Sequence, residues 1–343
     1  MTNIVNKLRI ANETELASRW GGAQPQRGEA EDGNDPRYQA IIRTNFSIKG
    51  RTGVMRTNDN DVALANGIHM PRVGLGTFDQ GSAATKAVQF AIKAGYRSID
   101  TGSYYQNEKE IGLGIRESGA PRQSLFITTK VWNSEHGFAA TLKSFEVSLE
   151  KLGLEYIDLY LMHWPVGGHN AETWKALEEI YEEGKARAIG VSNFEIHHLE
   201  ELKKTASVWP MVNQIELHPL KTSIELRKYC ADKGIQVEAW APLAQGNLAQ
   251  NPVLKKIADA HKKTLAQVVL RWHLQNDIVA IPKSSHERRI KENIDIFDFE
   301  LSASELAKID ALDENRHLLG FDADTFPSEL SLPPASPWPY ALS

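Results

Sequence analysis

From Asp61 onward, short apolar runs that favour strands alternate with longer stretches that favour helices. Several runs are almost continuously apolar, as in Ile157–Met162, which is typical of parallel strands buried on both faces. Eight such units in about 230 residues match a closed barrel better than an open sheet. The pattern therefore predicts an α/β fold, a (β/α)8 TIM barrel. An open, doubly wound sheet stays possible at this point, because alternation alone does not show closure.

The strand candidates are Val73–Thr77, Tyr96–Asp100, Leu125–Lys130, Ile157–His163, Ala186–Ser192, Met211–Glu216, Gln236–Trp240 and Ile278–Pro282. The helix candidates between them include Ala83–Lys93, Gly137–Leu152, Glu172–Glu183, Phe194–Thr205, Ser223–Lys233 and Pro252–His261. Before the first barrel strand, Val62–Leu64 and His69–Pro71 flank Asn66-Gly67, a pair that supplies the positive φ angles of a tight turn. We expect these residues to form a short hairpin that closes the bottom of the barrel.

The two ends of the chain differ from this regular region. Residues 1–54 include a stretch rich in Gly, Gln, Glu and Asp, and we expect a flexible N-terminal extension. Because the regular pattern begins just after Met55, that residue is an alternative native start. Residues 55–326 form the predicted barrel domain. Residues 327–343 are a proline-rich C-terminal tail that either covers the barrel opening or is disordered.

The composition is that of a soluble globular protein and excludes several functional classes. The chain has 343 residues, of which 41% are hydrophobic, and its net charge of −5 argues against a general nucleic-acid binder. It has no apolar run of the ~18 residues that a membrane span requires, and no secretory or transit signal. The single cysteine, Cys230, fits a reducing compartment. We therefore expect a cytoplasmic protein without nucleic-acid or membrane partners.

Polar residues gather at the ends of the predicted strands. Closure of the barrel would bring the carboxyl ends of all eight strands onto one face, which is where barrel enzymes carry their sites. Each residue alone has an ordinary explanation, such as a helix cap, a core tyrosine or histidine, or a surface lysine. Their joint placement is what indicates a site. These residues are Asp100, Tyr105, Lys130, His163, Ser192, Asn193, Gln214, Trp240, Lys283 and Ser284.

The residue types suit proton transfer to a carbonyl oxygen. A tyrosine has a reference pKa of about 10, and a neighbouring lysine ammonium would stabilise its phenolate and lower that value. An aspartate would keep the lysine charged and oriented, and a histidine at the same opening could donate a hydrogen bond to a substrate oxygen. Asp100, Tyr105, Lys130 and His163 thus form a candidate catalytic tetrad.

No side chain is an obvious nucleophile, so the electrons are expected from a cofactor. Trp240 offers an aromatic face for a flat ring, and Ser192, Asn193 and Gln214 could hydrogen-bond a carboxamide. The run from Lys283 to Arg289 combines cations with hydroxyls, as phosphate pockets do.

The motifs of several other chemistries are missing from the sequence. It contains no Rossmann fingerprint, nucleophile elbow, P-loop or spaced Cys/His metal cluster, so we expect no metal. The adjacent His197 and His198, beside two glutamates, are interpreted as part of a solvated helix face.

Six motifs in order carry a family resemblance from about Asp61 to Phe326, some three quarters of the chain. They are Gly95–Thr101 with Tyr105–Glu108, Thr129–Trp132, Leu161–Pro165, Ile189–Phe194, Val212–Pro219 and Ile281–Ser284. Together they resemble the aldo-keto reductase superfamily, most closely its short bacterial 2,5-diketo-gluconate and glyoxal or methylglyoxal reductases. The extension before Met55, the short segment after Pro165 and the proline-rich tail depart from the pattern.

The resemblance implies a role for each matching residue. It makes Tyr105 the general acid, tuned by Asp100 and Lys130, and makes His163 the group that orients the substrate. NADPH/NADP+ is the implied cofactor, bound by Thr77, Asp100, Ser192, Asn193, Gln214, Trp240, Leu243, Lys283, Ser284, Arg289, Glu292 and Asn293. The substrate pocket would be lined by Phe78, Trp132, His163 and Trp164.

The expected function is NADPH-dependent reduction of small aldehydes and ketones, of the α-dicarbonyl or keto-sugar type, by a monomer. One alternative is a nicotinamide-binding regulatory or interaction subunit with little turnover. Another is a barrel lyase or isomerase that uses the basic loop for a substrate phosphate.

Overall fold

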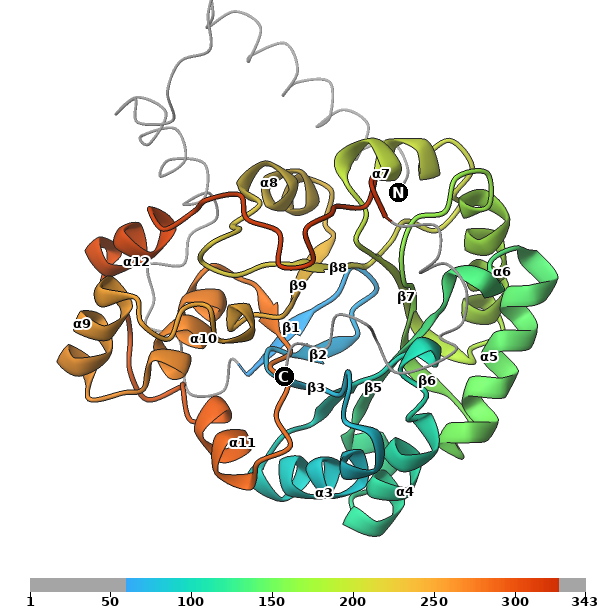
Figure 1. Ribbon diagram of the computed structural model, residues 1–343. Coiled ribbons are helices and arrows are strands. Elements are labelled where there is room, and N and C mark those ends of the chain that lie inside the picture. Colours follow the sequence, from blue (N-terminus) through green and yellow to red (C-terminus); the bar gives the residue numbers. More distant parts are fainter. Residues whose placement is uncertain (1–59, 327–343) are drawn as a thin grey trace, which may run out of the picture. The chain divides into compact units, whose positions relative to one another are not determined.

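The computed structural model describes residues 60–326 (Figure 1). The predictions for residues 1–54, for a start at Met55 and for the tail 327–343 lie outside the described residues. Within them, no helix is both long and apolar enough to span a membrane.

Eight parallel strands form the sheet, each hydrogen-bonded to the next in chain order from β3 to β10. Isolated parallel bridges join Val73 to Ala280 and Gly76 to Lys283, so the first and last strands also meet and the sheet closes. The predicted (β/α)8 barrel is therefore confirmed, and an open sheet is excluded. The strands are β3 (Gly74–Gly76), β4 (Ser98–Asp100), β5 (Phe126–Val131), β6 (Ile157–Met162), β7 (Ala186–Ser192), β8 (Val212–Glu216), β9 (Gln236–Trp240) and β10 (Val279–Ala280).

Helices surround the strands (Figure 1). Each of the predicted helices is present, with its ends within three residues of the predicted ones, because their apolar periodicity matches a buried stripe. The described helices are α3 (Ala84–Ala94), α4 (Glu108–Ser118), α5 (Phe138–Leu152), α6 (Asn170–Glu182), α7 (Ile196–Leu202), α8 (Ile224–Asp232), α9 (Pro252–His261), α10 (Leu265–Gln275), α11 (Glu287–Ile294) and α12 (Ala303–Asp310).

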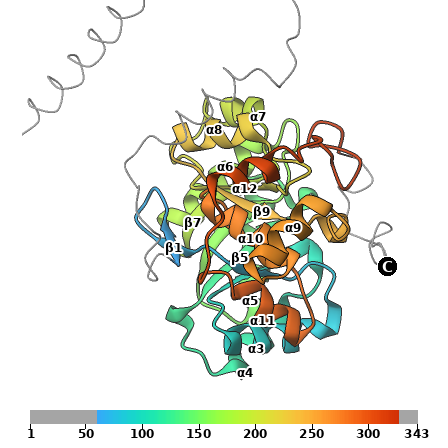
Figure 2. The ribbon, with the colours of Figure 1, turned by 90° about the vertical axis from the view of Figure 1, so that its left-hand side faces the viewer.

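The predicted hairpin is present as β1 (Asp61–Ala63) and β2 (His69–Pro71). Its turn differs from the expectation, because Gly67 has a positive φ of 84° and Asn66 does not. The Asn66 side chain instead donates a hydrogen bond of 2.9 Å to the backbone oxygen of Arg187, near the amino end of β7. The hairpin thus lies at the amino ends of the barrel strands. Figure 2 shows it at one end of the barrel and the segment after α12 at the other.

Two glycines of α4 allow close helix packing. A Cβ at Gly112 would lie 2.1 Å from the backbone oxygen of Leu152, and one at Gly114 would lie 2.8 Å from that of Thr85. The two glycines of the Gly112-Leu113-Gly114 run therefore allow α4 to pack closely against α3 and α5. This packing accounts for their presence, although the run matches no nucleotide-binding fingerprint.

We predict that Gly112→Ala lowers the free energy of unfolding by about 2–3 kcal/mol, because the new methyl group must displace backbone. This loss exceeds the ~1 kcal/mol by which alanine favours a helix over glycine. Urea denaturation monitored by circular dichroism measures it. Gly167→Ala is the matched control: a methyl group at this position has nothing within 4 Å, and a change within about 0.5 kcal/mol is expected. Equal stabilities of the two variants would contradict the packing argument.

Candidate active site

The four residues of the predicted tetrad lie together at the carboxyl ends of the barrel strands. Asp100 is the last residue of β4, and Lys130 lies near the end of β5. Tyr105 ends a short 3-10 helix, η2 (Ser103–Tyr105), which follows β4, and His163 comes directly after β6. The ring centroids of Tyr105 and His163 are 5.5 Å apart. The pairing of β4 with β5 and of β5 with β6 therefore brings these four side chains together at one end of the barrel, as the sequence predicted.

Lys130 is the centre of the tetrad. Its Nζ donates hydrogen bonds of 2.6 Å to Asp100 Oδ1 and 2.8 Å to the backbone oxygen of Thr101. It lies 3.3 Å from the hydroxyl of Tyr105. Lys130 is 0% exposed, so protein groups replace all of its solvation. Burial lowers the pKa of this ammonium, but Asp100, Tyr105 and Glu238 together raise it more, and the net shift is upward. The site therefore holds a permanent positive charge beside Tyr105.

The acidity of Tyr105 differs from the sequence-based expectation. Lys130 lowers the pKa of the Tyr105 hydroxyl, as expected. Burial raises that pKa by more, and the negative charge of Asp100 adds to the increase, so the net shift is upward. Tyr105 is therefore a neutral phenol at physiological pH, and Lys130 counteracts the effect of burial rather than making the phenol unusually acidic.

His163 is held as a neutral imidazole. Burial and the positive charge of Lys130 place its pKa well below the usual value of 6.5. The ring packs edge-to-face against Trp132, with centroids 5.0 Å apart, and the backbone oxygen of His163 accepts a hydrogen bond of 2.9 Å from Asn193. A neutral histidine carries one N–H, which is enough to donate to a single substrate oxygen.

A second group of predicted residues continues the site along β7, β8 and β9. Ser192 donates to the backbone oxygen of Gln214 at 2.8 Å, and Asn193 donates to the Ser192 hydroxyl at 3.1 Å. The indole N–H of Trp240 donates to Asn193 Oδ1 at 2.8 Å, which fixes the plane of the ring. Gln214 donates to Asp100 at 2.9 Å and so joins this group to the tetrad.

The predicted phosphate-binding residues lie at the start of α11. Lys283 and Arg289 are exposed, and the N-cap of the helix, His286, makes no capping hydrogen bond through its side chain. An uncapped helix start beside cations is a favourable place for a phosphate group. Ser284 is nearly buried, and its hydroxyl accepts a hydrogen bond of 3.1 Å from the backbone of His286.

The remaining predicted cofactor residues are distributed around this end of the barrel. Thr77 donates to the backbone oxygen of Asp100 at 2.8 Å and so lies against the tetrad. Leu243 is half-buried just before a short 3-10 helix, η5 (Ala244–Gly246). On α11, Asn293 is buried and Glu292 is half-buried.

An aromatic cluster lies beside the tetrad. Trp132 and Trp164 are buried in it with Tyr104, and Phe78 packs against them together with Tyr105. The segment after α12 completes the cluster, a contribution that the sequence analysis missed: Phe326 lies 4.5 Å from Trp164 between ring centroids. The residues that this segment contributes are Leu319, Phe321, Ala323 and Phe326.

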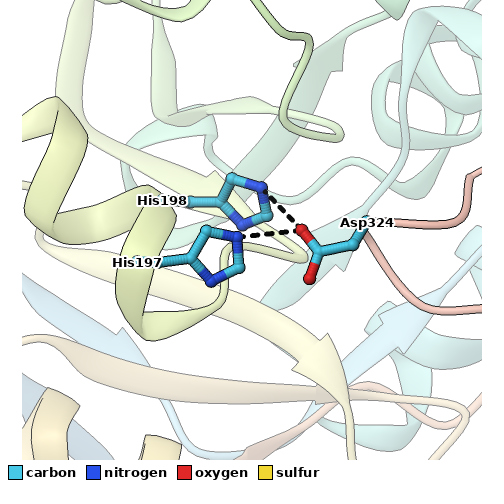
Figure 3. A group of neighbouring side chains, drawn as sticks. All are labelled: His197, His198 and Asp324. Carbon is cyan, nitrogen blue, oxygen red and sulfur yellow. Dashed lines mark hydrogen bonds and ion pairs between the residues drawn. The ribbon is translucent and has the colours of Figure 1, made fainter.

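This segment is held at two points. The backbone N–H of Leu318 donates to Glu216, at the end of β8, at 2.7 Å. Six residues later, Asp324 Oδ1 lies 2.8 Å from Nε2 of His197 and 3.3 Å from Nε2 of His198, both on α7 (Figure 3). The interpretation of these histidines as a solvated face is therefore wrong for His198, whose side chain is only 13% exposed.

The hydrogen bond that His198 accepts determines which of its ring nitrogens carries the proton. Its Nδ1 accepts from the backbone N–H of Glu195 at 3.2 Å, which leaves the proton of the neutral ring on Nε2. That N–H faces Asp324, so the ring is arranged to donate a hydrogen bond to the carboxylate. The contact links α7 to the segment that carries Phe321 and Phe326.

A sequence profile of the Aldo/keto reductase family matches residues 72–314. The chain belongs to this family. It is therefore an oxidoreductase.

Two curated relatives are matched over almost their whole length. The glyoxal reductase of Bacillus subtilis is 57% identical over 259 residues, which are 75% of this chain and 94% of that protein. The methylglyoxal reductase DkgA of Escherichia coli is 44% identical over 274 residues, 78% of this chain and 98% of that protein.

Solved structures also resemble this aldo/keto reductase. An aldo/keto reductase from Brucella melitensis is 47% identical, with a TM-score of 0.72 over 74% of this chain and 99% of that one. The Bombyx mori aldo-keto reductase, solved in complex with NADP, is 35% identical, with a TM-score of 0.72 over 75% of this chain and 94% of that one.

Glu238, a buried residue of β9 next to Gln214, was not among the residues predicted from the sequence. A signal was present: Glu238 and Trp240 are two residues apart on one strand, so they share a face. Leu319, Phe321 and Phe326 carried no such signal, because they lie in a segment without periodicity.

We predict that Asp324→Ala in this aldo/keto reductase speeds amide hydrogen exchange in residues 318–326 about two- to fivefold. The expected increase in exchange rate is modest because the His197–Asp324 pair is half exposed, and such contacts contribute about 0.2–1 kcal/mol to stability. Mass spectrometry of deuterated peptides measures the rates. Asp232→Ala, which removes an exposed pair with Lys228 within α8, is the control and leaves that segment unchanged. Unaltered exchange in the Asp324 variant would show that the contact does not hold the segment.

Proposed function

We propose that this protein catalyses NADPH-dependent reduction of small aldehydes and ketones of the α-dicarbonyl or keto-sugar type. The observation that carries the proposal is the buried contact of Lys130 with both Asp100 and the hydroxyl of Tyr105. This arrangement supports the proposal, because a phenol beside a fixed positive charge suits a carbonyl oxygen that becomes negative during reduction.

Each residue of the tetrad has a distinct part in this proposal. Tyr105 donates the proton to the substrate oxygen, and the ammonium of Lys130 stabilises the phenolate that results. Asp100 keeps Lys130 charged and in place. His163, neutral and next to Trp132, donates a hydrogen bond that orients the carbonyl toward Tyr105.

The residues around the tetrad fit a nicotinamide cofactor, which supplies a hydride when bound. Trp240, fixed by Asn193, would offer its face to the flat nicotinamide ring, and Ser192 and Gln214 would hydrogen-bond the ring's amide group. A phosphate group fits the uncapped start of α11 with Lys283 and Arg289. The NADP complex of the Bombyx mori relative supports the choice of NADPH.

The names of two relatives support the substrate class, since one is a glyoxal reductase and the other a methylglyoxal reductase. Phe78, Trp132 and Trp164 would line the substrate pocket together with His163, and the aromatic side chains of Phe321 and Phe326 would add to that lining. Residues 55–326 would act as one catalytic domain, in a cytoplasmic monomer.

We predict that Tyr105→Phe lowers kcat/KM for methylglyoxal at least about 100-fold, because no other group replaces the proton donor. NADPH affinity, measured by quenching of tryptophan fluorescence, stays within about twofold. Tyr181→Phe is the matched control: its hydroxyl contacts Asn66 at the opposite end of the barrel, and turnover is retained. Full activity of the Tyr105 variant would overturn the mechanism. Cofactor binding by the unmodified protein without turnover on a panel of carbonyls would indicate a regulatory subunit.

We predict that Arg289→Ala raises KM for NADPH about tenfold and leaves KM for NADH unchanged, since a charge-assisted contact to the extra phosphate is lost. Steady-state kinetics with both cofactors measure the two effects. Lys291→Ala removes an exposed cation that pairs with Glu287 on the same helix, and it serves as the control. Equal changes for NADPH and NADH would show that Arg289 does not recognise the phosphate.

A further inference from the structure

Glu238 is a carboxylic acid buried inside the barrel, next to the tetrad but outside the predicted site. It lies in the middle of β9 and is 0% exposed. Its Oε2 accepts a hydrogen bond of 2.7 Å from Nε2 of Gln214, the neighbour in the register between β8 and β9. Its Oε1 has no hydrogen-bond partner among the described residues. A buried carboxyl oxygen without a donor is the place where a proton is most easily held.

Gln214 joins Glu238 to the tetrad. Its Nε2 donates both to Glu238 and to Asp100 Oδ2, the latter at 2.9 Å. Because both partners are carboxyl oxygens, the amide nitrogen must face them, and the amide oxygen must face the other way. The contact with Glu238 therefore fixes the orientation of a side chain that the proposed function places against the nicotinamide amide.

The charges in this region favour a neutral Glu238. Asp100 is in direct contact with the ammonium of Lys130 at 2.6 Å, whereas the group that donates to Glu238 is the neutral amide of Gln214. If Glu238 were also ionised, the buried cluster of Asp100, Lys130 and Glu238 would carry two negative charges and one positive charge. Burial raises the pKa of Glu238 to about 8, with Asp100 adding to the increase, while Gln214 and Lys130 oppose it.

We propose that Glu238 is a positioning residue for the reaction: as a neutral acid it orients Gln214, and the loss of its proton at alkaline pH weakens proton donation by Tyr105. This inference rests on the proposed function, in which Tyr105 is the proton donor. In this proposal Glu238 acts through Gln214 and Tyr105 and touches neither substrate nor cofactor.

The direction of the pH effect follows from the charged and titratable groups that face Glu238, which are Asp100, Lys130 and the Tyr105 hydroxyl. Below the pKa of Glu238 the region holds one anion and one cation, and Tyr105 is the acid described above. Above that pKa the new anion raises the pKa values of both Tyr105 and Lys130. A phenol of higher pKa gives up its proton less readily, so reduction slows as the pH increases.

The test uses Glu238→Gln and Glu238→Leu in the full-length chain, with Glu108→Gln as the control. The first variant keeps an oxygen that accepts from Gln214 but cannot ionise, and the second keeps neither property. Glu108 is also a buried carboxyl group whose pKa burial raises, but it contacts Thr129 and Lys151 instead of the tetrad. Thermal unfolding confirms that each variant is folded before it is assayed.

Single-turnover reduction of methylglyoxal, followed by the loss of NADPH absorbance, gives the kinetic readout. We expect the rate of the unmodified protein to fall about five- to tenfold between about pH 6.5 and pH 9.5. Over the same range, Glu238→Gln stays within about twofold of its own maximum, whereas Glu108→Gln follows the unmodified protein. Glu238→Leu is slower at every pH and has a raised KM for NADPH, and Glu238→Gln rescues this defect.

Infrared difference spectroscopy gives a second readout that needs no turnover. A band of a protonated carboxyl group should disappear as the pH increases through about 8. That band should be absent in Glu238→Gln and present in Glu108→Gln. This measurement reports on the proton of Glu238 even if no carbonyl substrate is turned over.

The two readouts separate the failure of this inference from failure of the proposed function. A missing band, or identical pH profiles for Glu238→Gln and the unmodified protein, would overturn the positioning role. Absence of turnover on any carbonyl would overturn the proposed function, while the infrared band would still show whether Glu238 holds a proton beside Gln214.

Discussion

The ammonium of Lys130 is entirely cut off from solvent, and among residues 60–326 it is stabilised by the charge of Asp100 and by the oxygens of Thr101 and Tyr105. Removing a charge from water costs several kcal/mol, and an ion pair recovers this only with short contacts and full hydrogen bonding. Those contacts come from β4, β5 and η2: β4 and β5 are paired neighbours in the sheet, and η2 follows β4 directly. Gln214 on β8 also donates to Asp100 on β4, and these two strands are not neighbours in the sheet, so the candidate active site depends both on strand pairing and on barrel closure.

The sequence predicted the parts of the molecule that repeat. Buried parallel strands leave continuous apolar runs, and polar side chains at their carboxyl ends stand out against them, so Asp100, Lys130 and His163 could be found by position alone. The turn at Asn66-Gly67 was predicted with the wrong geometry, because the Asn66 side chain is used in a contact with Arg187 that no local pattern reveals.

Features that depend on burial could not be read from residue types. The effect of Lys130 on Tyr105 was predicted in the right direction, but its size relative to burial depends on how much protein surrounds the hydroxyl. The role of His198 likewise depends on Asp324, which lies more than a hundred residues further along the chain. Such long-range pairs follow from the three-dimensional arrangement and leave no trace in sequence spacing.

The segment after α12 contributes aromatic side chains next to the tetrad but no strand to the barrel. Its described part is held by Glu216 at one point and by two histidines of α7 at another. Mutations in this segment can therefore change the surface presented to a substrate without disturbing barrel closure or the ion pair of Lys130. Selection can therefore change this segment, and with it the surface next to the tetrad, while the barrel and the tetrad stay the same.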